Sequence, residues 1–163
     1  MLLVVGLLLI GYVDQQMREI RAADGSIIAV RDGDSLAIDR TEFRIHGIDA
    51  PELRQTCLDS NGKPWRCGEA AKAALRKLVA RGALRCAPQA HDRFHRVVAT
   101  CRVDGDVDIG MAMLRDGYAV LFGGVTEGGY VAAEMAARRD KRGIWQGSFT
   151  SPSDWRQNHP RGD

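Results

Sequence analysis

An amphipathic helix placed between two groups of strands limits the folds that are open to this chain. Over residues 68–81 the apolar side chains fall on one side of a helix, Lys and Arg side chains fill the other side, and Gly82 follows directly. Apolar and polar residues alternate in short runs, as they do in strands, both before and after this helix. The expected strands are residues 26–30, 36–39 and 41–48 before it, and 83–87 and 97–103 after it. This order is typical of an α+β domain.

Two more helices are expected, at residues 108–116 and 130–142, each followed by a glycine that suits a helix end. Three strands, a helix and two strands match the OB-fold, a five-stranded and partly open β-barrel. We therefore predict an OB-fold β-barrel with three helices. A length of 163 residues and a hydrophobic content of 45% fit one such domain, and a net charge of +2 permits a nucleic-acid partner without requiring one.

Residues 1–13 carry no charge and are almost all apolar. About 20 apolar residues are needed to span a bilayer, so this run is short for a complete membrane helix. We interpret residues 1–24 as an export signal or membrane anchor with a linker, residues 25–147 as the folded domain and residues 148–163 as a flexible tail. The expected location is the bacterial periplasm or the extracellular space, with residues 1–13 as a membrane tether if they are retained. A buried N-terminal helix is the alternative.

Four cysteines, at positions 57, 67, 86 and 101, have neither Cys-x-x-Cys spacing nor a pair of His residues placed to complete a zinc site. An even number of cysteines behind an apparent export signal favours disulfides. Of the three possible pairings we expect Cys57–Cys67, which would close the loop after an acidic cluster, and Cys86–Cys101, which would join two antiparallel strands. Four buried free thiols in a cytoplasmic protein are the alternative.

Acidic residues lie in two turns that a hairpin-like return of the chain could bring together. Asp32 and Asp34 precede the second expected strand, and Asp49 and Glu52 follow the third. Asp34 and Asp49, with a backbone carbonyl and water, would suit Ca²⁺, although two carboxylates can also hold Mg²⁺. Two ordinary turns with solvated acids are the alternative.

Two arginines, Arg44 and Arg96, lie on the third and the fifth expected strands. Two guanidinium groups that converge from different strands beside a metal ion would hold a phosphodiester and stabilise the charge that develops on phosphorus. Each of them, taken singly, is more often a surface arginine. Their functional value therefore depends on whether they converge.

Taken together, five motifs resemble those of the thermonuclease, or staphylococcal-nuclease-like, family. They are Asp32-Gly33-Asp34-Ser35, Phe43-Arg44-Ile45 with Gly47-Ile48-Asp49-Ala50-Pro51-Glu52, Asp92-Arg93-Phe94-His95-Arg96, Gly117-Tyr118-Ala119 and Gly143-Ile144-Trp145. They stand in the family's order and cover residues 26–147. Two positions depart from the usual pattern, because His95 stands where Gly is most frequent and Phe94 where Tyr is usual.

The resemblance implies a Ca²⁺-dependent phosphodiesterase on an OB-fold that cuts DNA and RNA and leaves 3′-phosphate ends. Carried over position by position, Asp34, Asp49 and the carbonyl of Ala50 would bind calcium, Arg44 and Arg96 would grip the phosphate, Glu52 would accept a proton from water, Asp32 would lie just outside the calcium ligands, and Asp92 would support the loop of Arg96. We expect a monomer with DNA or RNA as substrate. The alternatives are a non-catalytic nucleic-acid-binding OB module and an accessory protein of envelope or exopolysaccharide assembly.

Overall fold

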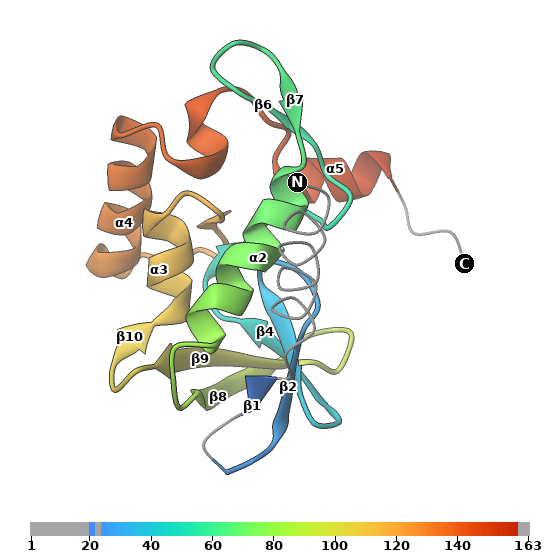
Figure 1. Ribbon diagram of the computed structural model, residues 1–163, viewed down its shortest axis with the longest axis vertical. Helices are drawn as coiled ribbons and strands as arrows, with labels where there is room; N and C mark the ends of the chain where they lie inside the picture. The colour runs from blue at the N-terminus through green and yellow to red at the C-terminus, as the bar shows by residue number, and fades with distance from the viewer. Residues whose placement is uncertain (1–19, 22–23, 160–163) are drawn as a thin grey trace, which may run out of the picture.

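The computed structural model describes residues 20–21 and 24–159. The expected export signal or anchor at residues 1–13 lies outside this part of the chain. Within the described residues, no helix is long and apolar enough to cross a membrane. They form a curled β-sheet with helices α2, α3 and α4 packed on one side of it (Figure 1).

The sheet is the OB-like barrel that the sequence predicts. Its five main strands are β2 (Ile27–Val30), β3 (Ser35–Ile38), β4 (Thr41–Ile45), β8 (Arg85–His91) and β9 (Val97–Val103). The first three form an antiparallel meander, β4 pairs with β9 in parallel, and β8 returns antiparallel along β9. Short strands β1 (Ile20–Arg21) and β10 (Val107–Asp108) extend the sheet at either end. The predicted fold class is therefore confirmed.

Two small strand pairs lie outside this sheet. Strand β5 (Ile48–Asp49) pairs with β11 (Val120–Leu121), and β6 (Cys57–Leu58) pairs with β7 (Pro64–Trp65). The first pair fixes the segment that follows β4 against a part of the chain about 70 residues further on, as its register couples Asp49 with Val120. Asp49 is thus held by sheet pairing rather than by a free loop.

The three expected helices are present as α2 (Cys67–Val79), α3 (Ile109–Arg115) and α4 (Gly128–Arg139). A short 3₁₀ helix, η1 (Gly143–Gln146), and a further helix, α5 (Pro152–Asn158), follow. Helix α5 lies in the segment that the sequence analysis expected to be a loose tail. Its start has local causes, because the Ser151 hydroxyl accepts a hydrogen bond from the amide of Asp154 at 3.1 Å and Pro152 occupies the first helical turn.

Both expected disulfides, Cys57–Cys67 and Cys86–Cys101, are formed. Cys86 and Cys101 are direct partners in the antiparallel register of β8 and β9. The Cys57–Cys67 bridge ties β6 to the first residue of α2 and belongs to a small apolar cluster with Ile144, Trp65, Trp145 and Phe149. Because three members of this cluster come from residues 144–149, it anchors the beginning of the C-terminal segment to the barrel.

Candidate active site

The two acidic turns meet, as the sequence analysis expected. Asp34 directly precedes β3, and Asp49 lies in β5 after the β3–β4 hairpin has returned the chain. The amide of Ala50 donates a hydrogen bond to Asp34 Oδ2 at 2.8 Å, so the two turns are joined directly. Both carboxylates are almost wholly buried, with 3% of Asp34 and 1% of Asp49 exposed. Buried carboxylates need partners, and the neighbouring arginines supply them.

Arg44 bridges the two aspartates from β4. Its Nη1 donates to Asp34 Oδ1 at 2.9 Å and its Nη2 to Asp49 Oδ1 at 2.8 Å. Burial raises the pKa of the Asp34 carboxyl to about 8, while the Arg44 guanidinium acts in the opposite direction. Burial disfavours the charged form of Arg44, yet Asp34 and Asp49 together raise the pKa of this guanidinium. One cationic group thus reaches both carboxylates at once.

Arg156, on α5, completes the network, although none of the sequence motifs includes it. Its Nη1 donates to Asp49 Oδ1 at 2.9 Å and to Glu52 Oε1 at 3.0 Å, and its Nη2 donates to Asp49 Oδ2 at 2.9 Å. Hydrogen bonding to Asp49 raises the pKa of the Arg156 guanidinium above its ordinary value. The helix-start signal at Ser151-Pro152 was available in the sequence, but nothing local points its side chain at Asp49.

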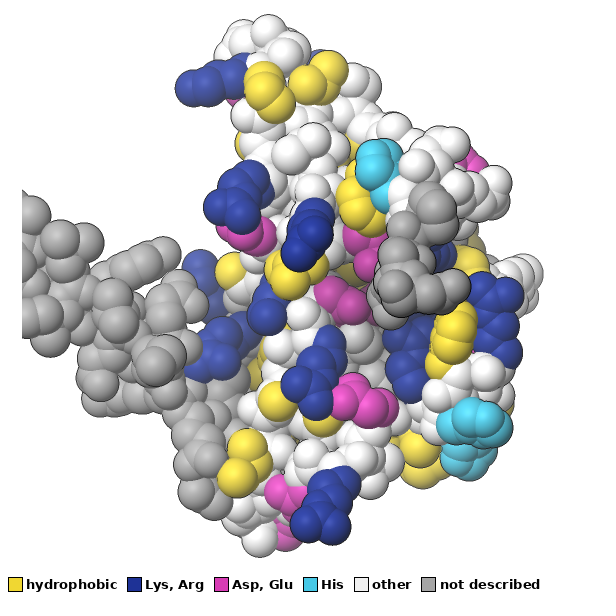
Figure 2. Space-filling view, turned by 90° about the vertical axis from the view of Figure 1, so that its right-hand side faces the viewer, with side chains coloured by type: hydrophobic (Ala, Val, Ile, Leu, Met, Phe, Trp, Pro, Cys, Tyr) yellow, Lys and Arg dark blue, Asp and Glu magenta, His cyan; other side chains and the backbone are white. Residues whose placement is uncertain are grey.

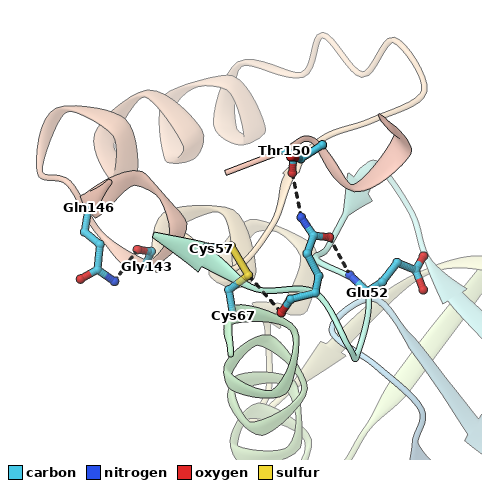
Figure 3. Close-up of a disulfide and its surroundings, with 7 residues drawn as sticks. Glu52, Cys57, Cys67, Gly143, Gln146 and Thr150 are labelled. Carbon is cyan, nitrogen blue, oxygen red and sulfur yellow. Dashed lines mark hydrogen bonds between the residues drawn. A yellow bond between two sulfur atoms is a disulfide. The ribbon is translucent and has the colours of Figure 1, made fainter. Parts of the chain in front are cut away.

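A buried glutamine, Gln55, connects the Glu52 loop to the segment that leads into α5 through its contacts with Glu52 and Thr150, which are labelled in Figure 3. The Gln55 side chain accepts a hydrogen bond from the Glu52 amide at 3.1 Å through Oε1 and donates to the Thr150 carbonyl at 2.7 Å through Nε2. The Cys57–Cys67 disulfide lies beside it, with Cys67 Sγ 3.4 Å from the Gln55 carbonyl oxygen. The position of Glu52 therefore depends on contacts with the C-terminal segment.

Arg96 directly precedes β9 and belongs to a second ion-paired group. In the parallel register Arg44 is opposite Val98, so Arg96, two residues before Val98, leaves the same face of the sheet as Arg44. Its guanidinium pairs with Asp92, with Nε 2.8 Å from Oδ2. Asp92 also accepts hydrogen bonds from the amides of Phe94 and Arg96. Burial acts to raise the pKa of the Asp92 carboxyl, but the hydrogen bonds outweigh burial and lower this pKa. Asp92 thus supports the loop of Arg96.

Asp32 orients the loop that carries Asp34. Its Oδ1 accepts hydrogen bonds from the Asp34 amide at 3.1 Å and from the Ser35 hydroxyl at 2.7 Å. This is an Asx turn, the local motif for which aspartate is favoured before a strand. The side chain therefore acts through Asp34 rather than on a bound group.

Aromatic rings lie against both Arg44 and Arg96. Phe122 is 5.4 Å from the Arg44 guanidinium carbon and Phe94 is 5.5 Å from that of Arg96, measured to the ring centroids. Both residues are exposed to solvent, Phe94 to 63% and Phe122 to 45%. Helix α5 and the β8–β9 loop occupy the right-hand side of Figure 1, and Figure 2 views this face, where Lys and Arg side chains surround a central group of acidic ones.

The β8–β9 turn explains why His95 is an unusual residue at its position. Its φ is 62°, in the left-handed region that glycine adopts without steric cost. We expect His95→Gly to raise the free energy of unfolding by about 0.5–1 kcal/mol, since the left-handed conformation costs other residues about 1–2 kcal/mol and glycine loses part of that gain through chain entropy. Urea denaturation measures the change, and His91→Gly, in strand β8, should act in the opposite direction. A destabilised His95→Gly variant would contradict this account.

Side chains alone do not supply all the ligands that a hard cation would need at this site. Within residues 20–21 and 24–159, no three His, Cys, Asp or Glu side chains are grouped so that they could hold a metal ion. Asp34 and Asp49 are nevertheless close enough to share the Arg44 guanidinium, and Ala50 lies beside them. Carboxylate, carbonyl and water oxygens are the ligands that Ca²⁺ and Mg²⁺ take. These residues therefore fit a calcium site that water and a backbone carbonyl complete.

Several known proteins are similar to this chain in sequence. A succinoglycan biosynthesis protein, ExoI, of Rhizobium meliloti (strain 1021) is 36% identical over 120 residues, which cover 72% of this chain and 62% of that protein. Probable endonucleases LCL3 are 29% identical over 134 residues in Scheffersomyces stipitis and 34% over 139 residues in Paracoccidioides brasiliensis (strain Pb03). These alignments cover 74% and 72% of this chain but 55% and 39% of the two relatives, so the chain spans about half the length of the proteins that it matches.

A sequence model of a protein family also matches this chain. The model of the staphylococcal nuclease homologue family matches residues 42–147, which include all of β4 except its first residue, together with Asp49, Glu52 and Arg96, and end just after η1. The predicted resemblance is therefore confirmed. The chain belongs to the family of staphylococcal nuclease homologues.

Proposed function

We propose that the protein is a calcium-dependent nuclease that hydrolyses phosphodiester bonds of DNA and RNA. The observation that carries the proposal is the buried pair Asp34 and Asp49, bridged by Arg44, with Glu52 joined to the same network through Arg156. Family membership and relatives named as probable endonucleases support it. Such a site combines oxygen ligands, fixed positive charge and a carboxylate base, which are the groups that phosphodiester hydrolysis requires.

In this proposal Asp34, Asp49 and the carbonyl of Ala50 hold Ca²⁺. When bound, the ion would polarise a phosphoryl oxygen and offset the charge that develops there. Asp32 keeps Asp34 in position through the hydrogen bonds of its turn. Asp92 does the same for Arg96.

The side chains of this chain carry the remaining roles. Arg44 and Arg96 bind non-bridging oxygens of the scissile phosphate and stabilise its added charge in the transition state. Glu52 orients the attacking water and accepts its proton as the oxygen–phosphorus bond forms. Cleavage of the bond between phosphorus and the 5′ oxygen, which takes a proton from solvent, leaves a 3′-phosphate and a 5′-hydroxyl.

Cleavage of single-stranded DNA and RNA in the presence of Ca²⁺ and then of chelator tests the proposal. We expect cleavage with Ca²⁺ and none after chelation, and products that a polymerase extends only after phosphatase treatment has removed the 3′-phosphate. Tight nucleic-acid binding without cleavage under any divalent ion would contradict it. That result would instead favour a non-catalytic nucleic-acid-binding OB module.

A second candidate is an accessory role in exopolysaccharide assembly, which the name of the Rhizobium meliloti relative favours. Deletion of the gene would then alter the amount or length of secreted polysaccharide. Complementation with a variant that cannot cleave DNA separates the two candidates. Restored polysaccharide with this variant would favour the accessory role.

We also propose that the protein is exported to an oxidising compartment and acts there as a monomer. The two disulfides support this location, because such bonds persist outside the reducing cytosol. Intact-mass measurement of exported protein after thiol alkylation should detect no free thiol. Four alkylated cysteines would contradict export into such a compartment.

A further inference from the structure

Arg156 occupies the oxygens that a metal ion would need. Asp49 Oδ1 accepts hydrogen bonds from both Arg44 and Arg156, and Asp49 Oδ2 accepts a second one from Arg156. A carboxylate offers about four acceptor positions, so Arg156 and Arg44 leave Asp49 little capacity for another cation. The same guanidinium also holds Glu52 Oε1. One side chain thus engages a proposed calcium ligand and the proposed base together.

Charge makes simultaneous occupancy unfavourable. Asp34, Asp49 and Glu52 are three carboxyl groups, and the Arg44 and Arg156 guanidinium groups already pair with them. Adding a divalent ion at Asp49 would place it within contact distance of the Arg156 guanidinium in a largely buried site, where repulsion between like charges is strong. Arg44 is fixed on a central strand, whereas Arg156 is on a terminal helix. Arg156 is therefore the cation that can leave.

The attachment of α5 is consistent with release. The chain is anchored as far as Pro152, by the buried Gln55 side chain, by Phe149 in the apolar cluster around the Cys57–Cys67 disulfide and by the burial of Pro152 itself. Beyond this anchor, Arg156 alone supplies three hydrogen bonds from α5 to the barrel. Figure 1 places α5 on the opposite side of α2 from α3 and α4, so the helix does not belong to that helical layer.

We propose that Arg156 is an internal cation that competes with the divalent ion for Asp49 and Glu52, so that binding of the ion releases α5 from the site. The inference rests on the proposed calcium site. It adds to the nuclease a C-terminal latch, defined as residues 153–158, that covers the acidic residues when no divalent ion is present. Release would also free the Arg156 guanidinium, which could then pair with the negatively charged backbone of the substrate.

Calorimetric titration of the full-length protein with CaCl₂ alone tests the competition. If the latch is closed in most molecules, the apparent affinity equals the intrinsic affinity reduced by the open fraction. Arg156→Gln should therefore bind Ca²⁺ about tenfold more tightly or better than the wild type, within the usual range of such coupling. Ser151→Ala, which removes the helix cap and no side chain of the site, should shift the affinity in the same direction by a smaller factor.

Arg139→Gln is the matched control, because Arg139 also donates to an aspartate, Asp140, but at the exposed end of α4. It should bind Ca²⁺ as the wild type does. Hydrogen exchange provides a second measurement on unmodified protein. Amides of residues 153–158 should exchange faster after CaCl₂ is added, while those of β3 and β4 should not. This readout decides the matter even if Arg156→Gln fails to fold.

The outcomes separate the latch from the nuclease. Unchanged or weaker Ca²⁺ binding in Arg156→Gln, with α5 protected equally in both conditions, would overturn the latch and leave the proposed function intact. Tighter binding in a protein that cleaves no nucleic acid would support the latch and count against the nuclease. Absence of calcium binding by the wild type, by Arg156→Gln and by Ser151→Ala would overturn the latch together with the proposed calcium site.

Discussion

Glu52→Gln is expected to lower kcat for single-stranded DNA by about 10²–10⁴-fold, the usual contribution of a positioned general base. Glutamine keeps the size of the side chain and can still accept a hydrogen bond from Arg156, but it does not take a proton from water. The main-chain amide of Glu52, which donates to Gln55, is unchanged, so the loop should keep its position. Initial rates at saturating substrate and Ca²⁺ give kcat, and thermal denaturation tests whether Tm is preserved.

The control for this variant is Glu69→Gln. Glu69 lies in the first turn of α2 and forms a solvent-exposed ion pair with Arg66. It should retain the kcat of the wild type. Equal rates for Glu52→Gln and the wild type would exclude Glu52 as the base, and a large fall in Tm would assign it a structural role instead.

Local patterns were sufficient for the main elements of the fold. Helix α2 was predicted over residues 68–81 and is found at Cys67–Val79, because its apolar stripe and its basic face alternate with helical period. Strand β8 was predicted at residues 83–87 and is found at Arg85–His91, with nearly all of its residues exposed. A polar strand that is defined by pairing with β9 carries no alternation from which its bounds could be predicted.

Some residues of the candidate site are brought together by local turns, and one reaches it from a distant part of the sequence. Asp34, Arg44 and Asp49 come from one hairpin and the residues just after it, so short-range turn signals could place them together. Arg156 contacts Asp49 across 107 residues, a separation over which no local pattern operates. The sequence signals at Ser151 and Pro152 could have predicted α5, but its position over the site depends on tertiary packing around Phe149 and Gln55.

Gly117→Ala should lower the free energy of unfolding by about 2–5 kcal/mol, as the sum of a left-handed backbone and an overpacked contact. Gly117 has a φ of 75° and lies against the backbone of Arg142 and Gly143, so that an added Cβ would overlap the Arg142 carbonyl oxygen. The Gly117 carbonyl also accepts the Ile144 amide at 2.9 Å, which fixes η1 next to the end of α3. Urea denaturation monitored by tryptophan fluorescence measures the loss.

Gly123→Ala separates the two causes, because Gly123 has nearly the same φ, 74°, and no heavy atom within 4 Å of an added Cβ. It should therefore show only the backbone cost of about 1–2 kcal/mol. The difference between the two variants measures the close approach of residues 117 and 143, where the two C-terminal glycine motifs meet. Equal losses in the two variants would mean that the Arg142 backbone moves away from the added methyl group at no cost. The tight packing of Gly117 and Gly143 would then not be what holds η1 against the barrel, nor the segment that leads from η1 to α5.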